Sequence, residues 1–294
     1  MSDRVTLPAL LGEYPVTRAL RRGEIPSPLV ELDFADVTSA AAGFKRVVRD
    51  LAFDVAELAI VTFLIAKAHG KPLVLLPTVV LGRFQHPYLV YNRERGPLAP
   101  GDLTGRRVGI RSYSVTTVTW LRGILADDFG VDLDRVTWVT FEEPHVAEFR
   151  DPPTVQRAAA GKDLLGMLLA GEIDAAILGG EPPADPRIAP LIPDPAGAAR
   201  AWRAKHDAIQ VNHLVTVKAS LSRERPDVVR EVARMLAASK RAAPAPGDPD
   251  TTPFGLEANR RNLEIAIDYV YRQRLIPRRY AVDELVDDVT RELP

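Results

Sequence analysis

The sequence contains no cysteine, which excludes disulfides, thiolate metal sites and cysteine nucleophiles. It also lacks an excess of either charge, because 38 Lys and Arg residues face 39 Asp and Glu residues and leave a net charge of −1 at pH 7. A chain this close to neutrality gives no electrostatic reason to expect nucleic acid or an anionic membrane as a partner.

Long apolar runs are missing too, since no uncharged stretch approaches the roughly 18 residues that a membrane-spanning helix needs. The opening residues, MSDRVTLPALLGEYPV, have no basic segment followed by an uninterrupted apolar one and do not resemble a secretory signal. We therefore expect a cytoplasmic location. With 294 residues, 46% of them hydrophobic and 26% charged, the chain is typical of a globular protein with one large domain or two lobes.

Short β-like runs alternate with amphipathic helical patterns, which predicts an α/β architecture with largely parallel sheets. The predicted strands are 29–36, 72–80, 86–92, 106–110, 135–141 and 213–219. The predicted helices are 116–130, which Gly130 ends, 162–172, and 226–242, which begins at Pro226. The Pro-rich segment 243–253 is interpreted as a connector between helices.

Two short motifs occur twice along the chain. GEYPVTRALRRG (12–23) resembles RSYSVTTVTWLRG (111–123), and AFDVAEL (52–58) resembles GEIDAAIL (171–178). Because the two motifs come in the same order in both halves, the pattern predicts a duplicated α/β lobe.

Both Tyr-x-Val-Thr segments are expected to be strand-to-helix loops, and ligands of α/β sheets bind beyond the carboxyl ends of the strands. Hydroxyls and free N–H groups at a helix N-terminus favour an anion. The candidates for holding a carboxylate or phosphate are Tyr14, Thr17, Ser114, Thr116 and Thr117. Each threonine is explained equally well as a helix N-cap.

A carboxylate stands in an apolar stretch, FDVAELAIVTFLIAKAHG (53–70), where Glu57 follows Asp54 by three residues. A strand is expected to turn into a buried helix here. Glu57 either caps the helix that begins near Leu58 or faces a ligand.

Several segments together resemble the 4,5-dihydroxyphthalate decarboxylase family, from about Leu11 to Lys240. They are FDVAELAIVTFLIAKAHGKPLVLLP, GRFQHPYLVYN, DLTGRRVGIRSYSVTTVTWLRGIL, AGEIDAAI and NHLVTVK. The resemblance implies a two-lobed type 2 periplasmic-binding-protein-like fold, with Rossmann-like lobes joined by crossover strands near 85–92 and 209–218. Lobe 1 would hold 1–86 and 214–294, lobe 2 would hold 87–213, and a ligand cleft would separate them.

The activity that the resemblance implies is non-oxidative decarboxylation of a hydroxylated aromatic dicarboxylate such as 4,5-dihydroxyphthalate, giving protocatechuate. Such a carboxy-lyase needs no redox cofactor, and the sequence shows no metal-binding pattern. The expected partner is a small aromatic carboxylate, and a homo-oligomer is compatible with the sequence. Glu57, facing the ligand from a loop, His86 and His213 are the catalytic candidates.

Substrate binding is assigned to Arg18, Arg83 and Tyr113 together with the hydroxyl residues of the two loops, because arginine forks suit carboxylates. Each basic residue has a structural alternative: a solvated hinge charge for Arg83, a structural histidine for His86, and a strand-edge histidine for His213. His69 is expected to interact with a helix end, and His145 and His206 are placed in polar loops.

Two other functions share the same scaffold. One is a solute-binding protein of an ABC-type transporter for a small carboxylate, which would need export or a lipid anchor. The other is a cytoplasmic enzyme of the futalosine route to menaquinone, which would need a pocket large enough for a nucleoside. Fold alone does not separate these functions.

Overall fold

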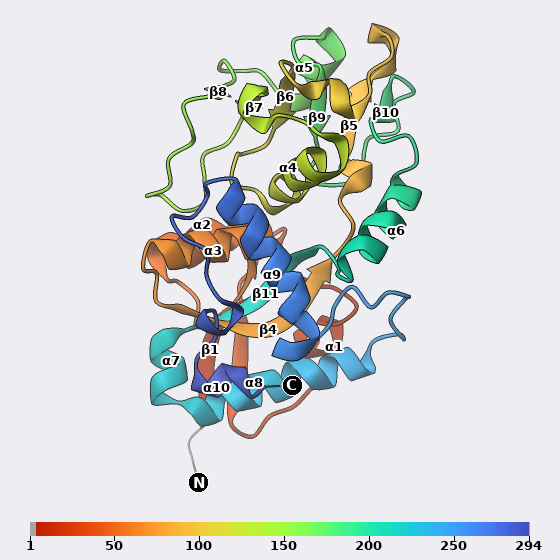
Figure 1. Ribbon diagram of the computed structural model, residues 1–294. Coiled ribbons are helices and arrows are strands. Elements are labelled where there is room, and N and C mark those ends of the chain that lie inside the picture. Colours follow the sequence, from red (N-terminus) through yellow and green to blue (C-terminus); the bar gives the residue numbers. More distant parts are fainter. Residues whose placement is uncertain (1–3, 294) are drawn as a thin grey trace. The chain divides into compact units, whose positions relative to one another are not determined.

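The computed structural model describes residues 4–293, which form two compact α/β units (Figure 1). Within that range, the first unit holds 4–83, 145–147 and 209–293, and the second unit holds 84–144 and 148–208. No helix in the described range is both long enough and apolar enough to cross a membrane.

The first unit is built on a five-stranded sheet in the order β2-β1-β3-β11-β4. The strands are β1 (Val5–Leu10), β2 (Val30–Phe34), β3 (Val55–Ala59), β4 (Leu73–Gly82) and β11 (Val211–Lys218). β1 runs parallel to β2 and β3, whereas β11 runs antiparallel to β3 and β4. The helices are α1 (Arg18–Arg21), α2 (Ala40–Asp50), α3 (Ile60–Ala68), α7 (Ala219–Glu224), α8 (Pro226–Ala242), α9 (Leu256–Arg272) and α10 (Asp288–Arg291).

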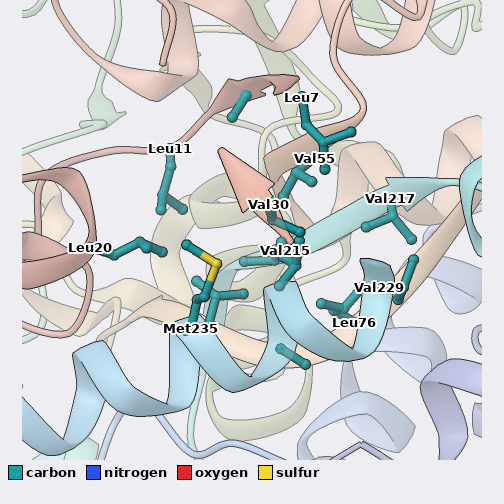
Figure 2. Close-up of a cluster of buried hydrophobic side chains, with 14 of the residues drawn as sticks. Leu7, Leu11, Leu20, Val30, Val55, Leu76, Val215, Val217, Val229 and Met235 are labelled. Atoms are coloured by element: carbon teal, nitrogen blue, oxygen red, sulfur yellow. The ribbon is translucent and has the colours of Figure 1, made fainter. Parts of the chain in front are cut away.

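Helix α8 covers one face of this sheet and closes its core. Its buried side chains recur at the helical period, and they include Val229 and Met235. Figure 2 shows these two residues packed against Val215 and Val217 of β11 and Leu76 of β4. Pro226 occupies the first turn of α8, as predicted, because its missing N–H would have no partner there in any case.

The second unit has a six-stranded sheet in the order β10-β5-β9-β6-β7-β8. The strands are β5 (Leu89–Asn92), β6 (Arg107–Ile110), β7 (Thr137–Thr140), β8 (Val155–Arg157), β9 (Ala175–Ile177) and β10 (Ile188–Pro190). The helices are α4 (Thr116–Phe129), α5 (Leu164–Ala170) and α6 (Pro195–His206). Gly130 ends α4 in the left-handed conformation, with φ of 66°, as its position in the sequence predicted.

Five strands of each unit share one order and one set of directions. The correspondence pairs the series β2, β1, β3, β11, β4 with the series β7, β6, β9, β5, β10. In each series the first three strands run parallel to one another, and each of the last two runs antiparallel to the strand before it. The repeated Tyr-x-Val-Thr motif follows β1 in one unit and β6 in the other, and the second motif lies at β3 and β9. The sheet topology thus agrees with the duplication that the motifs predicted.

The predicted strand 86–92 is wrong in its first half. Residues His86–Tyr88 form a 3₁₀ turn, and β5 begins only at Leu89. Pro87 explains the turn, because it has no N–H for a sheet ladder and its ring holds φ near −65°.

Candidate functional site

Glu57 lies in the middle of β3, so it stands neither at the start of a helix nor in a strand-to-helix loop, the two positions expected from the sequence. Its predicted catalytic role stays a prediction. The strand runs from Val55 to Ala59 and passes directly into α3 at Ile60, so no loop separates them. Ala59 is the N-cap of α3, and Glu57 caps no helix. All five residues of β3 are buried, and the side chain of Glu57 has no exposed surface. A buried carboxylate needs hydrogen-bond donors, and the fold supplies them.

Three donors surround the Glu57 carboxylate. The backbone N–H of Gly12 donates to Oε2 at 2.7 Å, and the Tyr14 hydroxyl donates to Oε1 at 2.6 Å. Nδ1 of His213 lies 2.6 Å from the same Oε1. Because a carboxylate only accepts hydrogen bonds, an ionised Glu57 is satisfied by these partners without contact to solvent.

The loop after β1 brings Gly12 and Tyr14 to the carboxylate. Thr17 ties this loop together: its hydroxyl donates to the Gly12 carbonyl at 2.7 Å and accepts from the Tyr14 N–H at 2.8 Å. Thr17 occupies the N-cap position of the four-residue α1, but its side chain makes no cap bond there. Its hydroxyl proton is therefore used inside the loop.

Tyr14 stays protonated in this setting. Burial, then the charge of Glu57 and the hydrogen bond to it, raise the pKa of Tyr14 well above its ordinary value, while the charge of Arg83 opposes the rise. The phenol is thus a fixed donor to Glu57. Gly12 is required beneath it, because a Cβ at position 12 would lie 2.7 Å from the Tyr14 ring.

His213 reaches Glu57 from the neighbouring strand. Glu57 pairs with Val215 in the β3–β11 ladder, so the side chain of His213, two residues away, projects from the same face. The ladder from β11 to β4 shifts register on both sides of His213, an irregularity of the kind that re-aims side chains. Because a carboxylate only accepts hydrogen bonds, Nδ1 of His213 is the donor in its contact with an ionised Glu57.

Sequence reasoning missed Phe44 and misjudged His145. The Phe44 ring packs edge-on against two histidine rings. The distance between ring centres is 5.1 Å to His213 and 5.6 Å to His145. His145 belongs to the first unit, is buried, and has Nδ1 2.9 Å from the Thr62 hydroxyl. Its carbonyl accepts from Arg49 Nε at 2.8 Å. No feature of the polar segment around His145 signals this burial.

The arginine candidates of the first unit differ in position. The charge of Arg83, at the end of β4, acts on Tyr14, and its backbone N–H donates to the Gln210 carbonyl. Arg18 is instead exposed and pairs with Glu13 at 3.4 Å. Arg83 is therefore the better placed of the two to meet an anion near Tyr14.

A cavity of about 340 Å³ borders Tyr14 in the first unit. Its walls are mainly apolar and include Val16, Val80 and Leu81. The segment 243–247, predicted to be a connector, has no regular structure but forms one wall. This volume lies within the range of pockets that bind small molecules.

His86, the third catalytic candidate, belongs to the second unit. It is almost wholly buried, and its Nδ1 has no hydrogen-bond partner among the described residues. Burial lowers the pKa of His86 to about 4, although the charge of Asp128 works in the opposite direction. His86 is therefore a neutral imidazole at pH 7.

The remaining candidates are also in the second unit, at the start of α4. They are buried and close together in the chain: Tyr113, Ser114, Thr116 and Thr117. Val115 is the N-cap of α4 and makes no side-chain cap bond, so neither threonine is the cap. Within residues 4–293, no group of three or more His, Asp or Glu side chains is arranged to hold a metal ion.

The strand order of the two units defines a class of protein: the fold is the type 2 periplasmic-binding-protein-like fold, as predicted. The periplasmic aliphatic sulphonate binding protein SsuA from Escherichia coli superposes with a TM-score of 0.58 at 12% identity, covering 97% of this chain and 98% of that chain. At this identity the likeness shows the fold alone. No family model matches the sequence.

Two curated relatives are named 4,5-dihydroxyphthalate decarboxylase. The protein from Pseudomonas putida is 29% identical over 213 residues, 68% of this chain and 82% of its own length. The protein from Comamonas testosteroni is 25% identical over 237 residues, 76% of this chain and 71% of its own length. The predicted resemblance to the 4,5-dihydroxyphthalate decarboxylases is confirmed, and the expected enzyme class, a carboxy-lyase, agrees with both names.

Proposed function

We propose that the chain catalyses the non-oxidative decarboxylation of a hydroxylated aromatic dicarboxylate, such as 4,5-dihydroxyphthalate, in the cytoplasm. The two relatives named as decarboxylases support the reaction class. The observation that carries the proposal is the buried Tyr14–Glu57–His213 network, which holds the His213 imidazole in one orientation. Tyr14, one member of this network, also borders a cavity of small-molecule size.

The reaction needs a proton donor more than it needs an electron carrier. A hydroxyl para to the departing carboxylate pushes electron density into the ring, and a general acid protonates the carbon that bears that carboxylate. The bond between the ring and the carboxylate then breaks, and its electron pair stays with the ring and restores aromaticity. Carbon dioxide leaves. The enzyme has to hold the carboxylates, orient the ring and place one acid at the reacting carbon.

His213 suits the role of that acid. Its side chain retains 14% exposure, whereas Glu57 has none, so the imidazole is the member of the pair that can meet a substrate. Glu57 fixes the tautomer through Nδ1 and stabilises the imidazolium, as a buried carboxylate does beside a catalytic histidine. Glu57 is then a positioning residue, and Nε2 of His213 carries the proton.

Arg83 and the cavity beside Tyr14 supply candidates for substrate binding. The arginine fork matches a carboxylate, and its charge already acts on Tyr14. The apolar walls of the cavity suit an aromatic ring. The roles predicted for His86, Tyr113, Ser114, Thr116 and Thr117 remain predictions.

The test is a spectrophotometric assay with 4,5-dihydroxyphthalate that follows protocatechuate and released carbon dioxide, with and without a chelator. Turnover that is lost in His213→Gln, retained in His69→Gln and insensitive to the chelator is the expected result. No turnover with this or other hydroxylated phthalates would contradict the proposal.

The likeness to sulphonate-binding proteins favours one alternative, a solute-binding protein for a small carboxylate. That function predicts thermal stabilisation by the aromatic acid without any product. The same samples distinguish the two functions, because only the decarboxylase releases carbon dioxide.

A further inference from the structure

Three residues of the chain leave the second unit and join the first. The segment 145–147 lies between β7 and β8, and the residues on both sides of it, 84–144 and 148–208, belong to the second unit. The segment forms no helix or strand, yet His145 and Val146 are buried. A connection between two strands of one sheet does not need to enter another unit, so the role of this segment is to be sought in the first unit.

His145 is held in the first unit at three points. Its carbonyl accepts a hydrogen bond from Arg49 Nε of α2 at 2.8 Å, and its Nδ1 lies 2.9 Å from the Thr62 hydroxyl of α3. Its ring packs edge-on against Phe44 of α2, with an angle of 85° between the ring planes. Because these contacts come from two helices and reach both the backbone and the ring, they fix the position and the tilt of the imidazole.

Phe44 connects His145 to His213. The buried face of α2 repeats at helical spacing and includes Phe44, and the helix packs against β3, the strand that carries Glu57. The Phe44 ring also packs edge-on against His213, with an angle of 80° between the ring planes. Phe44 is 1% exposed, and a closely packed interior leaves such a ring little room to turn. A displacement of His145 is therefore passed on to His213.

One hydrogen bond does not fix the direction in which His213 presents Nε2. Its Nδ1 lies 2.6 Å from Oε1 of Glu57, and this single contact still leaves the plane of the imidazole free to tilt. The edge-on contact with Phe44 restricts that tilt, because aromatic pairs have preferred geometries. Proton transfer requires the donor within hydrogen-bond reach of the reacting atom, so the tilt of the ring decides whether Nε2 can act.

We propose that His145 is a positioning residue for His213, and that the segment 145–147 supplies it to the first unit. Held by α2 and α3, His145 keeps the Phe44 ring against the imidazole of His213 and so sets the direction of Nε2. The inference rests on the proposed function, in which Nε2 of His213 carries the proton. The histidine that transfers the proton is then oriented by a segment whose flanking residues belong to the second unit.

The direct test is the NMR signal of the His213 ring in the ligand-free, full-length protein. The chain has five histidines, so the Cε1–H signals are few, and the signal that disappears in His213→Gln is assigned to His213. His145→Asn keeps a polar group that can reach Thr62 but removes the ring. We expect it to move or broaden the His213 signal, because the Phe44 ring changes its place. His69→Asn is the matched control, since His69 is exposed on the same unit, and should leave the signal unchanged.

Steady-state kinetics with 4,5-dihydroxyphthalate give the second readout. His145→Asn should lower kcat about 10–100-fold, the effect of a small misplacement of a reacting group, while KM stays close to the wild-type value. His145→Phe restores a ring against Phe44, so it should recover most of the lost kcat and return the His213 signal toward its wild-type position. In a Phe44→Leu background, His145→Asn should lower kcat little further, because His145 acts through Phe44.

A merely structural role gives a different pattern. His145→Asn would then lower the Tm while the His213 signal and kcat remained as in the wild type, and the proposal would be overturned. Additive effects of His145→Asn and Phe44→Leu on kcat would overturn it as well. If His145→Asn does not fold, His145→Leu takes its place with the same expectations, since leucine fills similar space without a ring.

The NMR measurement is independent of the assay for decarboxylation. A His213 signal that depends on His145, in a protein that decarboxylates nothing, keeps the link between the two histidines and discards the proposed reaction. Turnover that is lost in His213→Gln but unchanged in His145→Asn keeps the reaction and discards the positioning role.

Discussion

Glu57 and His213 stand on adjacent antiparallel strands and share a contact of 2.6 Å between Oε1 and Nδ1. The carboxylate is enclosed and the imidazole keeps a small exposed surface, so the two residues differ in what they can touch. This difference assigns orientation to Glu57 and proton transfer to His213 in the proposed reaction.

Replacing His213 with Gln should remove the proton donor while keeping a polar side chain of similar size. We expect kcat to fall by about 10²–10⁴-fold, the usual contribution of a general acid, with a much smaller change in KM. Steady-state kinetics measure both. His69→Gln is the matched control because His69 is exposed at the end of α3. A His213→Gln enzyme with wild-type kcat would contradict the assignment.

Glu57→Gln should reduce turnover without removing a group that contacts substrate. The amide offers one oxygen to three donors and turns its own N–H groups toward the others, so at least one buried donor loses its partner. We expect a loss of about 1–3 kcal/mol in the free energy of unfolding and a lower kcat, because the imidazole loses its fixed tautomer. Urea unfolding and a pH–rate profile measure the two effects.

Glu24→Gln serves as the control for this variant, since Glu24 is exposed. If Glu57→Gln unfolds like Glu24→Gln and keeps its kcat, the network does not act as described.

Gly12→Ala should disturb the site through Tyr14. The added methyl would lie 2.7 Å from the Tyr14 ring, so the ring has to move and its hydroxyl bond to Glu57 weakens. Overpacking of this kind costs about 1–3 kcal/mol of stability, and kcat should fall with it. Gly180→Ala is the control, because a Cβ at Gly180 meets no atom within 4 Å. Equal stability and activity for the two variants would disprove the steric argument.

His86 should make the protein less stable in mild acid. Its pKa of about 4 in the folded chain is below the ordinary value near 6.5, so the unfolded chain takes up a proton first as the pH falls. The contribution of the neutral His86 ring to the free energy of unfolding is therefore complete above pH 6.5 and is lost as the pH falls toward 4. Between pH 7 and pH 5 we expect His86 to account for a loss of about 2 kcal/mol.

Urea unfolding of the wild type, His86→Gln and His69→Gln at both pH values tests this expectation. His86→Gln should show a smaller acid loss than the wild type, and His69→Gln should show the same loss. Parallel losses in all three proteins would mean that His86 does not titrate as described.

Local signals predicted much of the fold correctly. Gly130 and Pro226 mark the end of α4 and the start of α8 because their backbone preferences act at the residue itself. The strands β2, β4, β6 and β11 were visible as apolar runs bounded by turn residues. The repeated motifs also predicted two units of one topology, because a strand–loop–helix unit is a local arrangement.

The site was harder to predict because its contacts are long-range. Glu57 meets Gly12, Tyr14 and His213, which are 45, 43 and 156 residues away in the chain. Composition and periodicity show that Glu57 is a carboxylate in an apolar stretch. Only the pairing of β3 with its neighbours shows that hydrogen-bond donors enclose it. The polar neighbours of His145 in the sequence predict an exposed loop, whereas the chain buries its ring beside Phe44.

The correspondence of the two sheets has a consequence for how such proteins diversify. The two copies of the loop differ in what lies against their tyrosines: Tyr14 donates to the Glu57 carboxylate, whereas the Tyr113 ring centre lies 3.6 Å from the guanidinium carbon of Arg122. The Glu57 network lies wholly within the first unit, so substitutions around Tyr113 leave its contacts in place. One unit can therefore change the residues of its loop while the other keeps its hydrogen-bond network.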